Sequence, residues 1–447
     1  MPDTQPPQDD AQTAGRNRRR GKIAVRLFGA LLALILLLAA ISAISIYAIQ
    51  SERGSFALWR TAVWLMQGRL SGQYIGGSVA HGVQMRDIHY RDSSTDFSIT
   101  DLDGRWRFAI GARKLSVDYL HIGDVDLRLQ PTPSEPALLP QDLRLPIAID
   151  LNDLSLQKLS IREGTADNDI AHLKLHGSSD GEHHNLTIDS LQTAYGDANA
   201  QLHLSGLRPF VLSGGLALSG AYGQEHYQID ARLSGSLQKL NLALNASGDK
   251  LNGDAQIDAA PFDAVPLQRA KINLAHINPK TFNAGAPQAD ITLRADLQPA
   301  ATPASASTSP TAPFTVTGTV SATNAIPGRI DQDRLPLQAI DADVTLSAAR
   351  QQLNHLSIKL PDGGSIDGQG AYQIGGTGDN NGEFDLAIAA LNLRALHGAM
   401  RPTRLHGPLT VKLRGDTQQV LLSLNDPTLS ADLDLLIDKE KLQIRQA

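Results

Sequence analysis

Apolar residues in this chain recur at every second position, in short segments that close on glycine. Four segments after Leu191 show this most clearly, and their glycines, Gly206, Gly220, Gly235 and Gly248, are spaced by about 14 residues. That spacing fits one strand and one turn, because successive side chains of a strand point to opposite faces. The pattern therefore predicts a meander of near-equivalent strands and argues against a set of separate globular domains.

Similar alternation begins near Gly68 and continues to the last residues. The clearest further strands are predicted at 106–110, 115–119, 125–129, 154–156, 173–175, 186–188, 316–320, 344–346, 356–358, 384–388, 411–413 and 433–435. Two segments, 130–140 and 299–313, are rich in Pro, Ala, Ser and Thr and cannot pair inside a sheet. We expect each of them to form a surface loop or a crossover connection.

The apolar positions of these strands are filled mostly by Leu, Ile, Val and Ala, and only 4% of the residues are aromatic. A compact sandwich would therefore lack its usual large core residues. Strands stacked crosswise at a spacing of about 4.8 Å would extend, for some 20 to 25 strands, on the order of 100 Å. We predict a mostly β fold in which residues 68–447 form an elongated, curled antiparallel meander with a hydrophobic groove.

The predicted groove lining shares one period-two phase near the repeated glycines. Its nine candidate residues are Leu202, Leu204, Leu216, Leu218, Ile229, Leu233, Leu242, Leu244 and Ile257. Each CH₂ group removed from water contributes roughly 0.8 kcal/mol, so many equivalent contacts would hold an acyl chain and still let it slide. The alternative is that these residues fill an ordinary closed core.

An uncharged apolar run at 27–51 follows a cluster of six basic residues at 16–26. A helix of that length crosses a bilayer, and basic residues favour the cytosolic side. We therefore predict a cytosolic basic tail (1–26), a transmembrane anchor (27–51), a short amphipathic helix (52–67) and the remainder on the far side of the membrane. A cleaved secretory signal is the alternative, although the run exceeds the usual length of such a signal.

Composition and motifs argue against several functions. The chain has no Cys, which excludes disulfides and thiolate chemistry, and its net charge of −6 argues against a nucleic-acid partner. We find no metalloprotease, nucleophile-elbow, Walker or dinucleotide motif, and no carboxylate pair typical of a glycosidase. His183 and His184 are neighbours on a predicted strand and would point to opposite faces. We expect no enzyme activity, catalytic residue, metal or cofactor.

One region resembles a known family. Residues 68–90 (GRLSGQYIGGSVAHGVQMRDIHY) follow the anchor and short helix and precede the segments DLDGRWRF and KLSVDYLHIGDVDLRL. This order resembles the start of the translocation and assembly module subunit TamB, within the AsmA-like group. The resemblance is carried by Gly68-x-Leu70-x-Gly72, a glycine pair near Gly76, Gly82-x-x-Met85 and Ile88-x-Tyr90.

The resemblance implies a protein of the bacterial inner membrane that extends a β-rich groove into the periplasm. It implies phospholipid transport between the inner and outer membranes, and a part in outer-membrane protein and autotransporter assembly (protein secretion). Its partners would be phospholipid acyl chains, the inner membrane and an outer-membrane Omp85-type barrel (TamA). Family members end in a domain that engages the barrel, whereas this chain stops at IRQA, so barrel docking would require a further C-terminal region.

A second hypothesis remains open beside transport. The edges of the predicted sheet could receive unfolded outer-membrane strands by β-augmentation, which would make the protein a periplasmic scaffold or chaperone.

Overall fold

The computed structural model describes residues 48–129, 138–163, 166–283, 285–300, 314–375, 380–415, 417–427, 429–438 and 441–446. Within them the chain forms one sheet of 23 strands with a few short helices. The predicted basic tail (1–26) and the predicted anchor up to residue 47 lie outside the described residues. So do 130–137 and 301–313 of the two predicted loop segments.

The first part of the chain holds the longest strands. It contains α2 (Glu52–Leu65), β1 (Leu70–Ser78), β2 (Gly82–Arg91), β3 (Thr95–Ala109), β4 (Lys114–Leu129), β5 (Ala148–Glu163), β6 (Ala166–Ser179), β7 (His183–Thr193), β8 (Gly196–Ser205) and β9 (Leu212–Tyr222). 

The remainder contains β10 (Glu225–Ser236), β11 (Lys239–Gly248), β12 (Asn252–Ala259), β13 (Leu267–Ile277), α3 (Pro279–Phe282), β14 (Ile291–Pro299), β15 (Thr315–Asn324), η2 (Ile330–Gln332), β16 (Ala339–Ser347), β17 (Arg350–Lys359), η3 (Pro361–Gly363), β18 (Ser365–Gln373), β19 (Asn381–Leu391), α4 (Leu393–Leu396), β20 (Leu405–Arg414), β21 (Thr417–Asp426), β22 (Leu429–Asp438) and β23 (Lys441–Gln446).

Every strand pairs with the strand that follows it in sequence. This confirms the predicted meander, with one correction. β4 and β5 are parallel, with Lys114 opposite Ala148 and Leu129 opposite Glu163. Because parallel neighbours cannot be joined by a hairpin, β4 and β5 are joined by a crossover connection.

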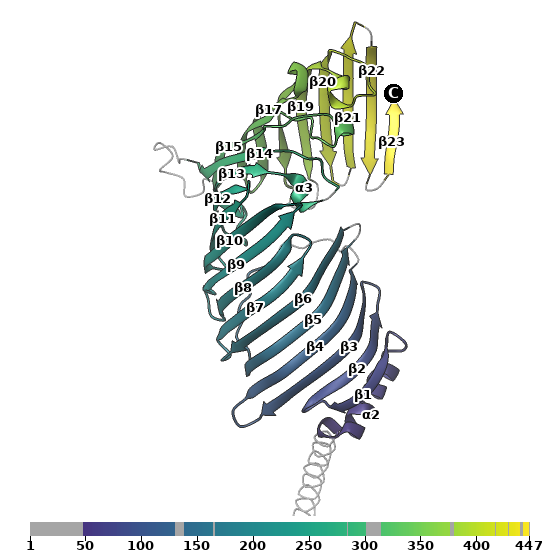
Figure 1. Cartoon of the computed structure of the whole chain (residues 1–447), viewed down its shortest axis with the longest axis vertical. Helices are drawn as coiled ribbons and strands as arrows, with labels where there is room; N and C mark the ends of the chain where they lie inside the picture. Colours follow the sequence, from purple (N-terminus) through teal and green to yellow (C-terminus); the bar gives the residue numbers. More distant parts are fainter. Residues whose placement is uncertain are drawn as a thin grey trace, which may run out of the picture.

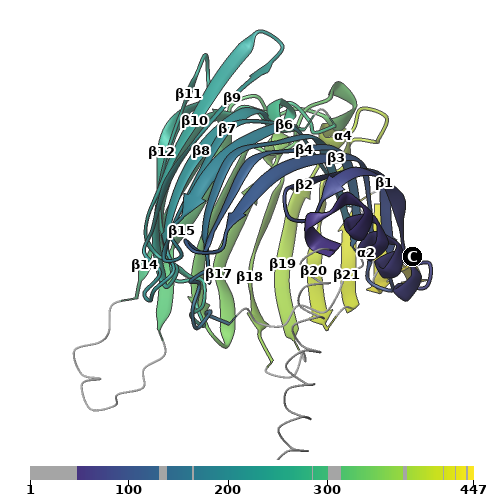
Figure 2. The ribbon, with the colours of Figure 1, turned by 90° about the horizontal axis from the view of Figure 1, so that it is seen from below.

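The sheet is curled and remains open. Figure 1 shows the strands stacked crosswise along the longest axis, with β1 at one end and β23 at the other. Seen end on in Figure 2, the long strands bend along their length, and successive strands wind around an open space. Among the described residues β1 pairs only with β2, and β23 only with β22.

α2 packs on the first strands through one face. Ser51 caps it by accepting a hydrogen bond from the Gly54 N–H at 3.1 Å. Ser55 is 1% exposed, and its hydroxyl accepts the Val79 N–H at 3.0 Å, which joins the helix to the β1–β2 connection. Among the described residues, no helix is both long and apolar enough to span a bilayer.

Two clusters of buried residues lie near the ends of the strands, where the connections fold. The strand ends form two sides of the sheet. We call the side that carries the connections after β1, β3, β6, β8 and β12 rim one, and the opposite side rim two. At rim one, Phe210 is fully buried, and Val265 packs with Leu297 and Val316. At rim two, Leu391 and Leu405 form a second cluster. The connections thus fold over the rims and leave the middle of the apolar face open.

Candidate functional site

All nine predicted groove residues lie on one face of the sheet. Strand pairing places Leu218 opposite Ile229, and Leu242 opposite both Leu233 and Ile257. The full set, carried by β8 to β12, is Leu202, Leu204, Leu216, Leu218, Ile229, Leu233, Leu242, Leu244 and Ile257. The opposite phase of the same strands carries Gln201, His203, Asp230, Asn245, Gln256 and similar polar residues.

The apolar face continues far beyond these five strands. One row of directly paired residues crosses the sheet from β4 to β22, and every member is Leu, Ile, Val, Ala or Gly. The row is Leu120, Leu154, Leu175, Ile188, Ala200, Leu216, Ala231, Leu244, Ala255, Ile272, Ala295, Val320, Ala342, Leu356, Gly368, Leu386, Leu409, Leu422 and Leu433. 

A second row lies two or three residues away along each strand and reaches β23. It runs through Trp106, Val117, Leu151, Gly177, Leu186, Leu202, Gly214, Leu233, Leu242, Ile257, Ala270, Leu297, Gly318, Val344, Leu353, Gly370, Phe384, Val411, Val420, Leu435 and Ile444. Neither row contains a charged or hydrogen-bonding side chain other than the Trp106 indole.

Large and small residues alternate along the first row from β8 to β19. Among the small ones, Ala255 and Ala295 are buried, at 6% and 8% exposure, and the others are half-buried, whereas Leu216 is 42% exposed. Large side chains cover the small residues opposite them. If Gly368 carried a Cβ atom, that atom would lie only 2.6 Å from the Leu386 side chain. Small residues between large ones let a sheet curl toward its apolar side, as in the tapered interior of small barrels.

The nine predicted residues are open to the groove. Eight are half-buried, and Leu216 is exposed. A hollow of about 320 Å³ lies over Leu186, Leu202, Leu216, Leu233 and Leu242, and apolar side chains form nearly all of its surface. A closed core, the alternative, would require such residues to be buried.

A comparison with protein families bears on this groove. Residues 128–270 match the family model described as TamB, N-terminal domain. This part of the chain is TamB-like. The matched range runs from the end of β4 into β13 and contains all nine predicted groove residues. Residues 68–90, which carried the resemblance in the sequence, precede it. Searches of curated proteins and of solved structures found no match.

A segment of the TamB-like region borders the groove at rim one. We call residues 138–147 the strap. The Leu143 N–H donates to the Gly206 carbonyl at 3.1 Å, and the Leu145 N–H donates to the Gly181 carbonyl at 2.8 Å. The Arg208 guanidinium donates to the Pro140 carbonyl at 3.0 Å. The strap therefore links the connections that follow β6 and β8, beside the apolar face.

His184 holds the strap from the groove side. Its Nε2 lies 3.0 Å from the Leu143 carbonyl oxygen, and its Nδ1 lies 2.8 Å from the Ser179 hydroxyl. Because a carbonyl can only accept, Nε2 carries the proton and Nδ1 accepts from Ser179. The neighbouring His183 points to the other face and contacts Asp180, whose carboxylate raises the pKa of His183. The two imidazoles thus have separate partners, as their adjacency on a strand predicted.

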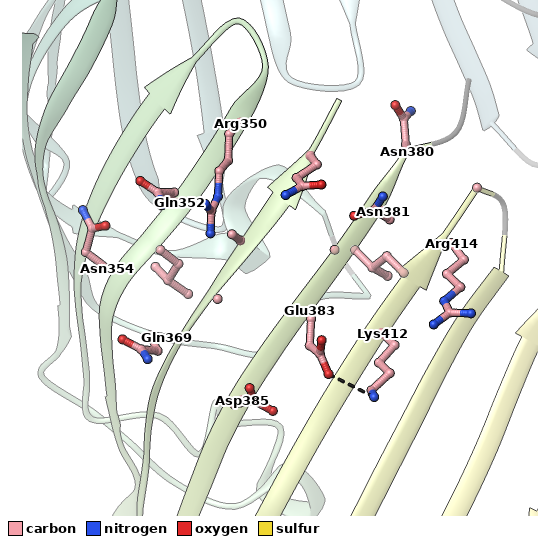
Figure 3. Close-up of a pocket in the computed structure, with 17 residues that line it drawn as sticks. Arg350, Gln352, Asn354, Gln369, Asn380, Asn381, Glu383, Asp385, Lys412 and Arg414 are labelled. Carbon is pink, nitrogen blue, oxygen red and sulfur yellow. Dashed lines mark ion pairs between the residues drawn. The ribbon is translucent and has the colours of Figure 1, made fainter. Parts of the chain in front are cut away.

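A larger hollow lies on the polar face of the sheet. It measures about 900 Å³ and lies over β17 to β20. Figure 3 shows its lining of amide and charged side chains, in which Lys412 Nζ donates to Glu383 Oε1 at 3.0 Å. These are ordinary groups of a solvated sheet face. Among the described residues, no group of three or more His, Asp or Glu side chains is placed to hold a metal ion.

The sequence identified only part of the apolar face. Ile188, Ile272 and Leu356 belong to the same row as Leu216, and the period-two pattern of their own strands could have identified them. The small members of the row carry no such signal, because Ala and Gly occur on either face and in turns. Ala231 and Ala255 belong to the groove only through their pairing with Leu244.

Proposed function

We propose that this TamB-like chain is the N-terminal part of a conduit for phospholipid acyl chains between the inner and outer membranes. The observation that supports it best is the unbroken apolar row from β4 to β22. Each CH₂ of an acyl chain removed from water gains roughly 0.8 kcal/mol anywhere along such a row. Because the contacts are weak and alike from strand to strand, a bound chain can slide without crossing a large barrier.

The setting of the conduit is part of the proposal. The apolar run at 27–51 would anchor the chain in the inner membrane, with the N-terminus in the cytosol and the sheet in the periplasm. A role in outer-membrane protein and autotransporter assembly, with an Omp85-type barrel as partner, is what the TamB resemblance implies.

The decisive experiment places charge on one face at a time. Leu218→Arg and Leu244→Asp would each put an ionised group on the apolar face, which costs several kcal/mol unless the group reaches water. We expect a fall of about a hundredfold or more in lipid passage. The matched controls Ser219→Arg and Asn245→Asp carry the same charges on the polar face of the same strands and should transport normally.

The variants also separate the competing interpretations. Equal tolerance of charge on both faces would refute the conduit. If Leu218→Arg and Leu244→Asp fail to accumulate while the two controls do accumulate, these residues belong to a closed core. A lipid-capturing photocrosslinker at Leu216 completes the set, since this exposed side chain lies over the apolar hollow.

A scaffold for unfolded outer-membrane strands is the second candidate. The observation that favours it is the unpaired outer edge of β23, which in the described part of the chain bonds only to β22. An exposed edge offers backbone donors and acceptors to an incoming strand. The scaffold predicts that a photocrosslinker at Gln443 captures polypeptide. If the photocrosslinker at Leu216 also captures polypeptide and no lipid, the scaffold is favoured over the conduit.

A further inference from the structure

The turn between β3 and β4 combines exposed apolar side chains with basic ones. Phe108 is 49% exposed and Ile110 is 78% exposed. The hairpin tip, residues 105–114 (RWRFAIGARK), contains four cations and no acidic residue. Arg105 and Arg107 share Asp118, at 4.0 and 2.9 Å, with their own side chains about 70% exposed. Tips of this composition suit the boundary between lipid headgroups and acyl chains.

Hydrogen bonds tie this tip to the point where the chain leaves its apolar run. The Trp106 N–H donates to the His81 carbonyl at 3.0 Å, and the Trp106 indole N–H donates to the Val79 carbonyl at 2.9 Å. The Ala80 N–H donates in turn to the Ile49 carbonyl at 3.0 Å. Since 27–51 is the predicted anchor, these bonds place the hairpin tip beside its membrane exit.

The tip is also continuous with the groove. Trp106 belongs to the second apolar row, and Phe108 pairs with Leu115, which pairs with Ile149 on β5. Phe108 and Ile110 follow Trp106 at every second position, and they extend the apolar face beyond rim one. Apolar surface therefore extends without interruption from the exposed tip to the groove.

We propose that the hairpin tip (105–114) docks on an anionic phospholipid bilayer and forms the ramp by which acyl chains pass from that bilayer into the groove. Phe108 and Ile110 enter the acyl region, while Arg107, Arg113 and Lys114 lie at the level of the anionic headgroups. The ramp rests on the proposed function, whereas the docking does not.

Docking is tested in the full chain reconstituted into vesicles of phosphatidylglycerol and phosphatidylethanolamine. The chain has no Cys, so Ile110→Cys gives a unique site for an environment-sensitive fluorophore. Ile330→Cys is the matched control, because Ile330 is 59% exposed and lies in η2 at rim two. We expect nitroxide-bearing lipids to remove most of the emission at position 110 and little at position 330. Equal quenching at the two positions overturns docking.

Two further arms test the lipid charge and the ramp. Replacing phosphatidylglycerol by phosphatidylcholine should reduce quenching at position 110, and unchanged quenching contradicts the role of the basic residues.

The ramp is tested by lipid capture at Leu216. Ile110→Asp should lower lipid capture by a photocrosslinker at Leu216 several-fold, whereas Ile330→Asp should not. Equal capture in the two variants overturns the ramp. If the wild-type crosslinker captures no lipid while position 110 is quenched, docking stands and the proposed function fails.

Discussion

The apolar face is built in two different ways along the sheet. β3 to β6 have 14 to 16 residues each, whereas β8 to β12 have 8 to 12. At about 3.3 Å per residue, β3 to β6 are about 50 Å long, and β8 to β12 are about 25 to 40 Å long. The groove is therefore widest across β3 to β6.

The pairing of side chains differs in the same way. In the wide region large residues face large ones, as in the pairs Ile122 with Leu156 and Leu156 with Leu173. From β8 to β19 the first row alternates between a large residue and Ala or Gly. This difference shows that hydrophobicity alone does not define the groove. Along the first row, the wide region presents only large side chains, while the narrow region alternates them with small residues that allow a tight curl.

The largest effect should come from filling a small position in the narrow region. Ala255→Leu places a side chain where Leu244 and Ile272 already lean over a residue that is 6% exposed. Overpacking of this kind costs about 1 to 3 kcal/mol. Chemical denaturation of the full chain in detergent should show the loss. Gln256→Leu, on the exposed face of the same strand, is the control, and equal stability of the two variants would refute the role of alternation.

Period-two alternation is local information, and for that reason the sequence predicts the strands and the phase of the groove. Leu216 and Leu218 could be assigned to one face from their own strand. The size alternation depends on which residues meet across strands, and nothing near Ala255 in sequence indicates that it will face Leu244. The parallel pairing of β4 with β5 is also a long-range property, since the 130–140 segment was compatible with either a loop or a crossover.

A smaller effect is expected where the strap connects the two regions. His184→Ala removes hydrogen bonds to the Leu143 carbonyl and the Ser179 hydroxyl, which typically stabilise by about 1 kcal/mol each. The Leu143 and Leu145 amides should then exchange with solvent faster, as measured by hydrogen exchange and mass spectrometry. If the strap stays equally protected, it does not depend on His184 for its position.

The control for that variant lies on the neighbouring strand. His203→Ala removes an imidazole whose Nδ1 bonds to the Asn185 side chain at 2.6 Å on the polar face. It should leave the protection of Leu143 and Leu145 unchanged. A loss of protection in both variants would point to a general loosening of β7 and β8 instead.

The smallest effect is a pH dependence at His183, beside the strap. Asp180 raises the pKa of His183, first by a hydrogen bond and then by its charge. A group with a raised pKa in the folded state stabilises the fold fully below its ordinary value of about 6.5 and loses that contribution as pH rises through the raised value. Because His183 is exposed, solvent screening keeps the effect small. NMR titration of His183 should show a pKa that falls in Asp180→Asn, a change that retains an oxygen acceptor for the Glu182 and His183 N–H groups. An unchanged titration would show that the ion pair does not form in solution.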